Sequence, residues 1–181
     1  MDSLFNFYSL TNASPEAKPL LEKINASYGF IPNLFAYMAE APATIEAYLA
    51  LNELISKSSL TPQNAQLALW VTSIENQCEF CRIAHQAFAK KFGVKEQTYH
   101  AILTGQKIEC PTDAALVNFT QAVVNKRGHL AHTDLESFLG AGFNQQQIME
   151  IILVVTIKTL SNYINHLTHP EVNPEVLALL K

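Results

Sequence analysis

The chain has 181 residues, of which 49% are hydrophobic and 15% are charged. This composition excludes intrinsic disorder, and a chain of this length can bury a hydrophobic core without help from a metal or a disulfide. Its 12 Lys and Arg against 16 Asp and Glu give a net charge of −4. The basic surface that nucleic-acid binding requires is missing, so we expect no nucleic-acid partner.

Hydrophobic residues recur every three or four positions along almost the whole chain, which is the spacing of amphipathic helices. Prolines mark several helix starts and glycines several helix ends. We predict helices at residues 15–28, 33–40, 43–57, 62–75, 78–92, 95–104, 112–127, 133–140, 145–167 and 174–180. Since the connections are short and no linker divides the chain, we expect residues 1–181 to form a single all-α domain, a bundle of about 8–10 helices.

Residues 148–155 are apolar on most sides, which predicts a central buried helix or a subunit interface, with a strand as the weaker alternative. The apolar stretch contains Glu150 and ends before Lys158, far short of the roughly 20 apolar residues of a membrane-spanning helix. The first residues resemble no export signal. We therefore expect a cytoplasmic protein with no membrane partner.

Three residues near the middle of the chain carry the chemistry. Cys78, Cys81 and His85 follow the pattern Cys-x-x-Cys-x-x-x-His at the start of a predicted helix. At about 100° per residue, Cys81 lies about 300° and His85 about 340° round from Cys78. All three side chains therefore share one face of the helix.

This placement suits redox chemistry. A helix N-terminus stabilises a thiolate and lowers the pKa of a thiol. The Cys-x-x-Cys spacing lets a disulfide close within one helical turn and reopen by exchange. His85 follows Cys81 by four residues, so it can accept or relay the proton of that thiol. Cys78, Cys81 and His85 are the candidate catalytic residues.

The motif resembles that of the carboxymuconolactone decarboxylase superfamily, in its AhpD-like alkylhydroperoxidase branch. Two further stretches are similar to the peroxidase-related members of that superfamily. One is residues 28–34, followed by Ala41 and Pro42, and the other is residues 60–62, which open the helix that leads into the motif. The resemblance is best over residues 28–93.

The resemblance implies an all-helical subunit that assembles as a homotrimer or hexamer, and a thiol peroxidase or disulfide reductase cycle. In that cycle Cys81 attacks a hydroperoxide and becomes a sulfenic acid, and Cys78 resolves it to a disulfide. No bound cofactor is implied, because an external dithiol, lipoamide-like or thioredoxin-like, supplied by a reductant protein, restores the thiols. His85 matches the family histidine that helps to deprotonate the cysteine.

One departure from the family pattern concerns the proton relay. The family's relay glutamate lies twelve residues before the first cysteine, and Gln66 occupies that position here. A glutamine can orient His85 but cannot accept a proton. Glu75 is the nearest substitute, so Gln66 and Glu75 are the candidates for the surrounding relay. Peroxidase activity is therefore expected to be weak or shifted in substrate.

Other interpretations stay open. The cysteines can serve as small hydrophobic residues on a packed helix face. A zinc-stabilised assembly module is another, with a fourth ligand from His100 or Cys110. A third is a non-redox carboxymuconolactone decarboxylase-like enzyme on the same fold. Two His-x-x-His pairs also invite a metal, although each lies near a predicted helix end: His129 with His132, and His166 with His169.

Overall fold

A computed structural model describes residues 4–180, and this part of the chain folds into ten helices without a strand. The helices are α1 (Ala17–Tyr28), α2 (Asn33–Met38), α3 (Pro42–Ser56), α4 (Pro62–Glu75), α5 (Glu79–Lys91), α6 (Glu96–Thr104), α7 (Pro111–Asn125), α8 (His132–Gly140), α9 (Gln145–Thr168) and α10 (Pro174–Ala178). Each corresponds to a predicted helix with its ends within about two residues. The all-α fold class is confirmed, and residues 148–155 lie in α9 rather than in a strand.

Side-chain caps fix where the two central helices begin. Thr61 accepts a hydrogen bond from the backbone of Asn64 at 3.2 Å and precedes Pro62, the first residue of α4. Asn144 and Gln147 form a reciprocal capping box at the start of α9, each side chain accepting from the other's backbone N–H at 3.0 Å. These bonds satisfy backbone donors that a helix start leaves free.

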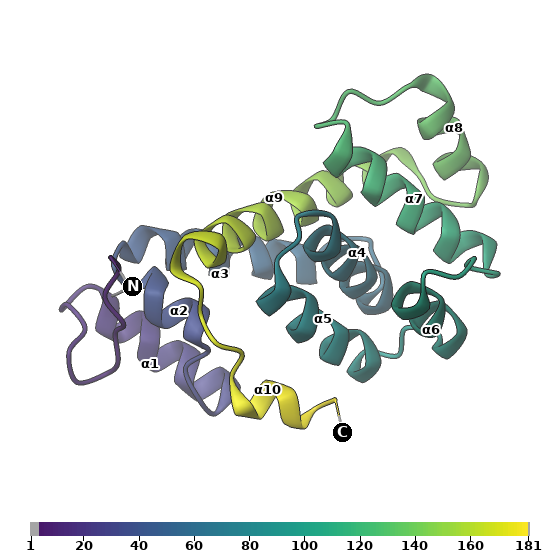
Figure 1. Cartoon of the computed structure of the whole chain (residues 1–181). Helices are drawn as coiled ribbons and strands as arrows, with labels where there is room; N and C mark the ends of the chain where they lie inside the picture. The colour runs from purple at the N-terminus through teal and green to yellow at the C-terminus, as the bar shows by residue number, and fades with distance from the viewer. Residues whose placement is uncertain (1–3, 181) are drawn as a thin grey trace.

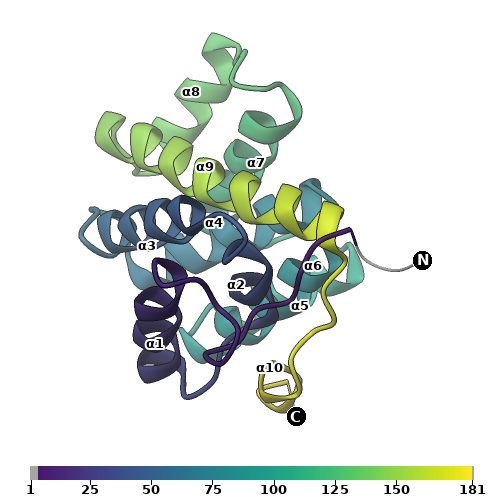
Figure 2. The ribbon, with the colours of Figure 1, turned by 90° about the vertical axis from the view of Figure 1, so that its left-hand side faces the viewer.

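Helix α4 is the centre of the molecule. It packs against α5, α7 and α9, and its Trp70 is fully buried. Figure 1 shows α9 running from α7 and α8 across to α2 and α3, and Figure 2 shows the same helix lying across α3 and α4. Helix α4 thus packs directly against both α5, which carries most of the motif, and α9.

Helix α9 has two different faces. Lys158, Ser161, Asn162 and Asn165 are all buried at positions i, i+3, i+4 and i+7, and we call them the α9 polar stripe. The opposite face exposes large apolar side chains: Met149, Ile152, Tyr163 and Leu167. By length and composition alone α9 could cross a membrane. In the described structure the helix packs on α2, α3, α4 and α7.

The last helix returns to the first part of the chain. The Asn173 side chain accepts from the backbone N–H of Asn33 at 2.8 Å, and the two side-chain amides are joined at 3.1 Å. This link fixes the segment that leads to α10, which packs against α5 at the end of the molecule away from α8 (Figure 2). Helix α10 therefore closes one side of the region around the motif.

Candidate active site

A sharp turn between α4 and α5 positions the two thiols. The backbone N–H groups of Gln77 and Cys78 donate to the carbonyls of Ile74 and Ser73, at 2.9 and 3.0 Å. This pattern is a Schellman motif, and Gln77 takes the left-handed conformation (φ 56°) that glycine usually supplies there. Cys78 consequently caps α5 from just outside the helix, and Cys81 lies in its first turn.

Both thiols are buried against the α9 polar stripe. Cys78 is 2% exposed and Cys81 is 1% exposed. The Asn165 Nδ2 donates to the Cys81 Sγ at 3.1 Å and lies 3.7 Å from the Cys78 Sγ. The Ser161 Oγ is 4.0 Å from the Cys81 Sγ. The motif on α5 thus meets amide and hydroxyl groups that come from residues about 80 positions later in the chain.

A second amide ties the turn before the motif to α9. The Asn76 Nδ2 donates to the Asn162 Oδ1 at 2.9 Å, which orients the Asn162 amide. The Asn162 Nδ2 is buried without a hydrogen-bond partner of ordinary length. This Asn162 amide helps to lower the pKa of the Cys81 thiol. A buried amide donor without a partner is costly in an apolar core. Beside a thiolate, the same donor stabilises negative charge.

Lys158 brings a positive charge into this buried site. It is 1% exposed, its Nζ lies 2.7 Å from the His85 Nε2, and it stands 6.0 Å from the centre of the Tyr48 ring. An ammonium can only donate, so the His85 Nε2 accepts and the ring proton is on Nδ1. That Nδ1–H donates to the Gln66 Oε1 at 3.2 Å. Lys158, His85 and Gln66 therefore form one chain of hydrogen bonds.

The environment gives the two cysteines opposite ionisation. A hydrogen bond from Cys78, the charge of Lys158 and the amides of Asn162 and Asn165 lower the pKa of Cys81 against the effect of burial. The pKa of Cys78 is raised by its hydrogen bond to Cys81, by burial and by the neighbouring negative charge. Cys81 is therefore the thiolate of the pair at neutral pH, and Cys78 stays a thiol.

The two basic groups of the site also differ. Burial lowers the pKa of His85 well below its ordinary value, and the charge of Lys158 lowers it further, so the imidazole is neutral. Burial is the largest single effect on Lys158 and lowers the pKa of the ammonium, but the combined electrostatic effects of Cys81, Tyr48 and Cys78, with a hydrogen bond to Cys81, outweigh burial and raise the pKa. Lys158 and Cys81 thus form a buried pair of opposite charges.

A cavity of about 630 Å³ reaches this pair of charges. Cys81, His85 and Lys158 line it, and its walls include the aromatic side chains of Tyr28, Phe30, Phe35, Tyr48, Phe80, Phe88 and Phe92. Helix α10 closes one side with Val176 and Leu179. Among the described residues that line the cavity, Cys81 is present and Cys78 is not. A molecule bound in the cavity therefore meets the thiolate first.

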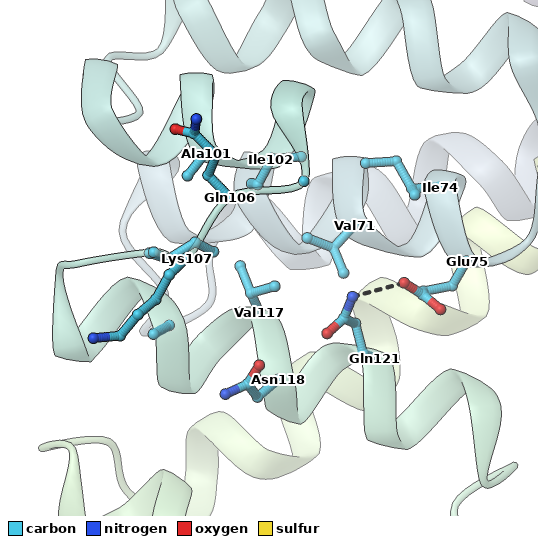
Figure 3. Close-up of a pocket in the computed structure, with 13 residues that line it drawn as sticks. Val71, Ile74, Glu75, Ala101, Ile102, Gln106, Lys107, Val117, Asn118 and Gln121 are labelled. Carbon is cyan, nitrogen blue, oxygen red and sulfur yellow. Dashed lines mark hydrogen bonds between the residues drawn. The ribbon is translucent and has the colours of Figure 1, made fainter.

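The predicted relay residues do not lie together. Gln66 contacts His85, but Glu75 lies at a second cavity of about 450 Å³ bounded by α4, α7 and the α6–α7 connection. Figure 3 shows its carboxylate pointing toward Gln121, which donates to it at 2.8 Å, while Asn125 donates at 2.7 Å. Nine residues of helix turn about 900°, so Gln66 and Glu75 point to opposite sides of α4. The expectation that Glu75 substitutes for the relay glutamate is corrected accordingly.

The residues weighed for a metal are scattered. His100 lies 3.6 Å from Glu96, and the Cys110 Sγ lies 2.9 Å from the Lys95 Nζ. His132 lies 3.3 Å from Glu136. Within residues 4–180, no three His, Cys, Asp or Glu side chains are grouped so that they could hold a metal ion. The zinc interpretation therefore has no set of ligands in this part of the chain.

Reasoning from the sequence missed the α9 polar stripe. In the sequence, Lys158 marks only the end of an apolar stretch. The available signal was the spacing Lys-x-x-Ser-Asn-x-x-Asn in an otherwise apolar helix. Four polar residues at i, i+3, i+4 and i+7 share one face, and a buried polar face needs a partner.

Comparison with known proteins places this arrangement in a family. Residues 42–123, which contain the Cys-x-x-Cys motif, match the Carboxymuconolactone decarboxylase family. The chain is also similar to the structure of an uncharacterized peroxidase-related protein from Ralstonia eutropha, described as an alkylhydroperoxidase AhpD core. The TM-score is 0.83 at 21% identity, and the match covers 96% of this chain and 94% of that one. Residues 42–123 thus carry the sequence pattern of the Carboxymuconolactone decarboxylase family, and the whole chain shares the fold of this AhpD-like protein.

Other solved structures share this fold. A peroxidase-related protein from Silicibacter sp. has a TM-score of 0.76 at 20% identity, over 97% of this chain and 96% of that one. The debrominase Bmp8, in a cysteine-to-alanine variant bound to 2,3,4-tribromopyrrole, has a TM-score of 0.78 at 17% identity, over 99% and 97% of the chains. No curated protein sequence matches the chain. At these identities the structures establish that the chain has an AhpD-like fold, and nothing beyond the fold.

Proposed function

We propose that the chain is a thiol-dependent peroxidase or disulfide reductase of the AhpD-like type, with a hydroperoxide as its oxidising substrate. The observation that carries this proposal is the asymmetry of the dithiol. The cysteine with the lowered pKa lines the cavity, and the cysteine with the raised pKa lies behind it. A peroxidatic thiol needs the thiolate form and access to its oxidant.

The reaction uses both sulfurs. The Cys81 thiolate attacks the outer oxygen of the hydroperoxide, an S–O bond forms, the O–O bond breaks, and an alcohol and a Cys81 sulfenic acid result. The Cys78 sulfur then attacks the Cys81 sulfur, the S–S bond forms, and the oxygen leaves as water. The two sulfurs interact in the reduced site, so the resolving thiol starts beside the sulfur that is oxidised. An external dithiol, lipoamide-like or thioredoxin-like, reduces the disulfide by exchange.

His85 and Gln66 hold the polar groups in place in this proposal. The imidazole accepts a hydrogen bond from Lys158 and donates to Gln66, so any proton that His85 relays passes through Lys158. Gln66 accepts that hydrogen bond without taking the proton. A glutamate at position 66 would add a second negative charge to the site. Because Gln66 is uncharged, the Cys81 thiolate remains the principal negative charge near the Lys158 ammonium.

The exposed apolar face of α9 supports self-association. Met149 is 69% exposed and Leu167 is 66% exposed on the side of α9 away from the thiols. Exposed apolar patches on a stable protein mark contacts with other chains. We propose that this face joins subunits into a homotrimer or hexamer, and that the protein works in the cytoplasm beside a dithiol reductant protein.

A second reaction fits the same site. The cavity is lined by aromatic rings and ends at a thiolate, and the similar debrominase was crystallised with a brominated pyrrole. Reductive dehalogenation balances with one thiolate and one thiol, because an aryl bromide then yields the arene, bromide and the Cys78–Cys81 disulfide. A panel with cumene hydroperoxide and a bromopyrrole would rank the two substrates by the rate of disulfide formation.

A thiol count tests the proposed function. In a Cys110→Ser background two thiols remain, and one equivalent of cumene hydroperoxide should remove both, with recovery on adding dihydrolipoamide. Cys78→Ser should stop at a Cys81 sulfenic acid that mass spectrometry detects, and Cys81→Ser should not react. If both thiols persist at neutral pH, the redox proposal fails. Retained turnover of a cyclic carboxylic acid by the cysteine variants would favour the decarboxylase-like reading instead.

A further inference from the structure

The starting point is the buried charge of Lys158. Its side chain is 1% exposed, and within residues 4–180 no carboxylate oxygen lies within ion-pair distance of it. A buried ammonium without a counter-charge is strongly disfavoured. Cys81 lines the same cavity, and its thiolate is the strongest of the groups that favour the charged form of Lys158. Oxidation of Cys81 removes this negative charge from beside the ammonium.

The groups around Lys158 come from three helices. Helix α3 contributes Tyr48, α5 contributes His85 and Cys81, and Cys78 lies directly before α5. Helix α4 contributes the uncharged Gln66, which reaches Lys158 through His85. Two further charged side chains, Lys91 and Glu175, line the same cavity; both are solvent-exposed, and neither forms an ion pair with Lys158.

We propose that Lys158 is the acid of the reaction. It donates a proton to the alcohol oxygen that is released when the O–O bond of the hydroperoxide breaks, and it is a neutral amine in the oxidised protein. This inference rests on the proposed thiol peroxidase function. It assigns a catalytic role to a residue outside the Cys-x-x-Cys-x-x-x-His motif and outside residues 42–123, the segment that matches the family.

The protons and charges balance on this path. The reduced site holds the Cys81 thiolate, the Cys78 thiol and the Lys158 ammonium, and it reacts with one hydroperoxide. The products are the disulfide, one alcohol, one water and the Lys158 amine. The O–O bond takes up the two electrons of the sulfurs, the alcohol oxygen takes the lysine proton, and the thiol proton of Cys78 leaves with the water. The site is neutral before and after, so no charge is left buried alone.

Geometry favours the lysine over the histidine as this acid. The His85 Nε2 accepts a hydrogen bond from Lys158, and its Nδ1–H is directed to Gln66. His85 therefore has no free proton to offer the cavity. Lys158 lines the cavity together with Cys81 and has three protons on Nζ. Once the thiolate becomes a disulfide, burial favours the neutral amine.

Two substitutions separate an acid from a simple counter-charge. Lys158→Arg keeps the positive charge but cannot release a proton, since a guanidinium stays charged in proteins. Iodoacetamide needs the thiolate but no acid, because iodide leaves without a proton. We expect Lys158→Arg to be alkylated at Cys81 within about twofold of the parent rate and to be oxidised by cumene hydroperoxide about 100-fold more slowly. Lys126→Arg, an exposed matched control, should match the parent in both reactions.

The neutral variant provides the second arm. Lys158→Met lacks the positive charge, so Cys81 should need a higher pH to be alkylated by iodoacetamide. At a pH where its alkylation rate equals that of the parent, its oxidation by cumene hydroperoxide should still be about 100-fold slower than in the parent. Circular dichroism checks that each variant is folded. Equal recovery of alkylation and oxidation in Lys158→Met, or oxidation of Lys158→Arg at the parent rate, would reduce Lys158 to a counter-charge and overturn the inference. A parent protein that is alkylated but never oxidised would overturn the proposed function itself, and this inference with it.

Discussion

Replacing Asn165 tests what sets the pKa of the Cys81 thiol separately from what stabilises the fold. Its Nδ2 lies 3.1 Å from the Cys81 sulfur, and its Oδ1 is buried without a partner. A hydrogen bond to a charged group contributes about 1.5–3 kcal/mol, and 1.36 kcal/mol corresponds to one pH unit, so Asn165→Leu should raise the pKa of Cys81 by about one to two units. The orphaned carbonyl disappears in the same change, and leucine has a similar shape. Removing the orphaned carbonyl offsets the lost stabilisation of the thiolate, so the melting temperature of the reduced protein should change little.

The assay is a pH titration of the thiolate, followed by its ultraviolet absorbance and by the rate of iodoacetamide alkylation. Asn125→Leu is the matched control, because that exposed amide donates to Glu75 and not to a thiol. It should leave the titration of Cys81 unchanged. An unchanged titration in a folded Asn165→Leu variant would refute the idea that the α9 polar stripe sets the ionisation of the thiol.

Three further outcomes are expected. Glu75→Gln should keep the hydroperoxide reaction within about twofold of the parent, since the carboxylate faces the second cavity, and a large loss in stopped-flow kinetics would restore it to the relay. The pKa of Cys81 is lowered to about 5 in the folded protein against about 8.5 in the unfolded chain. Its thiolate therefore stabilises the reduced fold fully above about pH 8.5, and this contribution is lost as the pH falls toward 5. Urea unfolding of reduced protein should show the advantage over Cys81→Ser shrinking across that window, and a constant difference would contradict the lowered pKa. Leu167→Glu should reduce the mass measured by light scattering to that of a monomer, whereas Leu4→Glu, at an exposed position outside α9, should not; an unchanged mass would exclude the outer face of α9 as the interface.

The helices were predictable because their signals are local. Hydrophobic spacing, helix-initial prolines and helix-final glycines act over one or two turns, and the structure follows them closely. The shared face of Cys81 and His85 follows from the same short-range geometry. One detail escaped: α5 begins at Glu79 because the turn at Gln77 leaves Cys78 just outside the helix. The turn has no glycine at its left-handed position, so the sequence carries no clear signal for it.

The rest of the site depends on contacts that local patterns do not specify. Lys158 and Asn165 follow Cys81 by 77 and 84 residues, so only the packing of α9 on α4 and α5 brings them together. Proximity in sequence also misled. Glu75 is three residues from Cys78 but points away from it, whereas Gln66 is twelve residues away and contacts His85. Direction around α4 decides this, and separation along the chain does not.

All four members of the α9 polar stripe belong to one rigid helix whose start is fixed by the Asn144 capping box. A one-residue insertion between that cap and the stripe would turn the stripe by about 100° and withdraw the cation, the hydroxyl and both amides from the sulfur at once. The groups that surround the sulfur therefore lie on one helix, and the cysteines lie at and just before the start of another. A shift of α9 relative to α5 would change the charge and the hydrogen bonding of the Cys81 sulfur without changing the Cys-x-x-Cys motif.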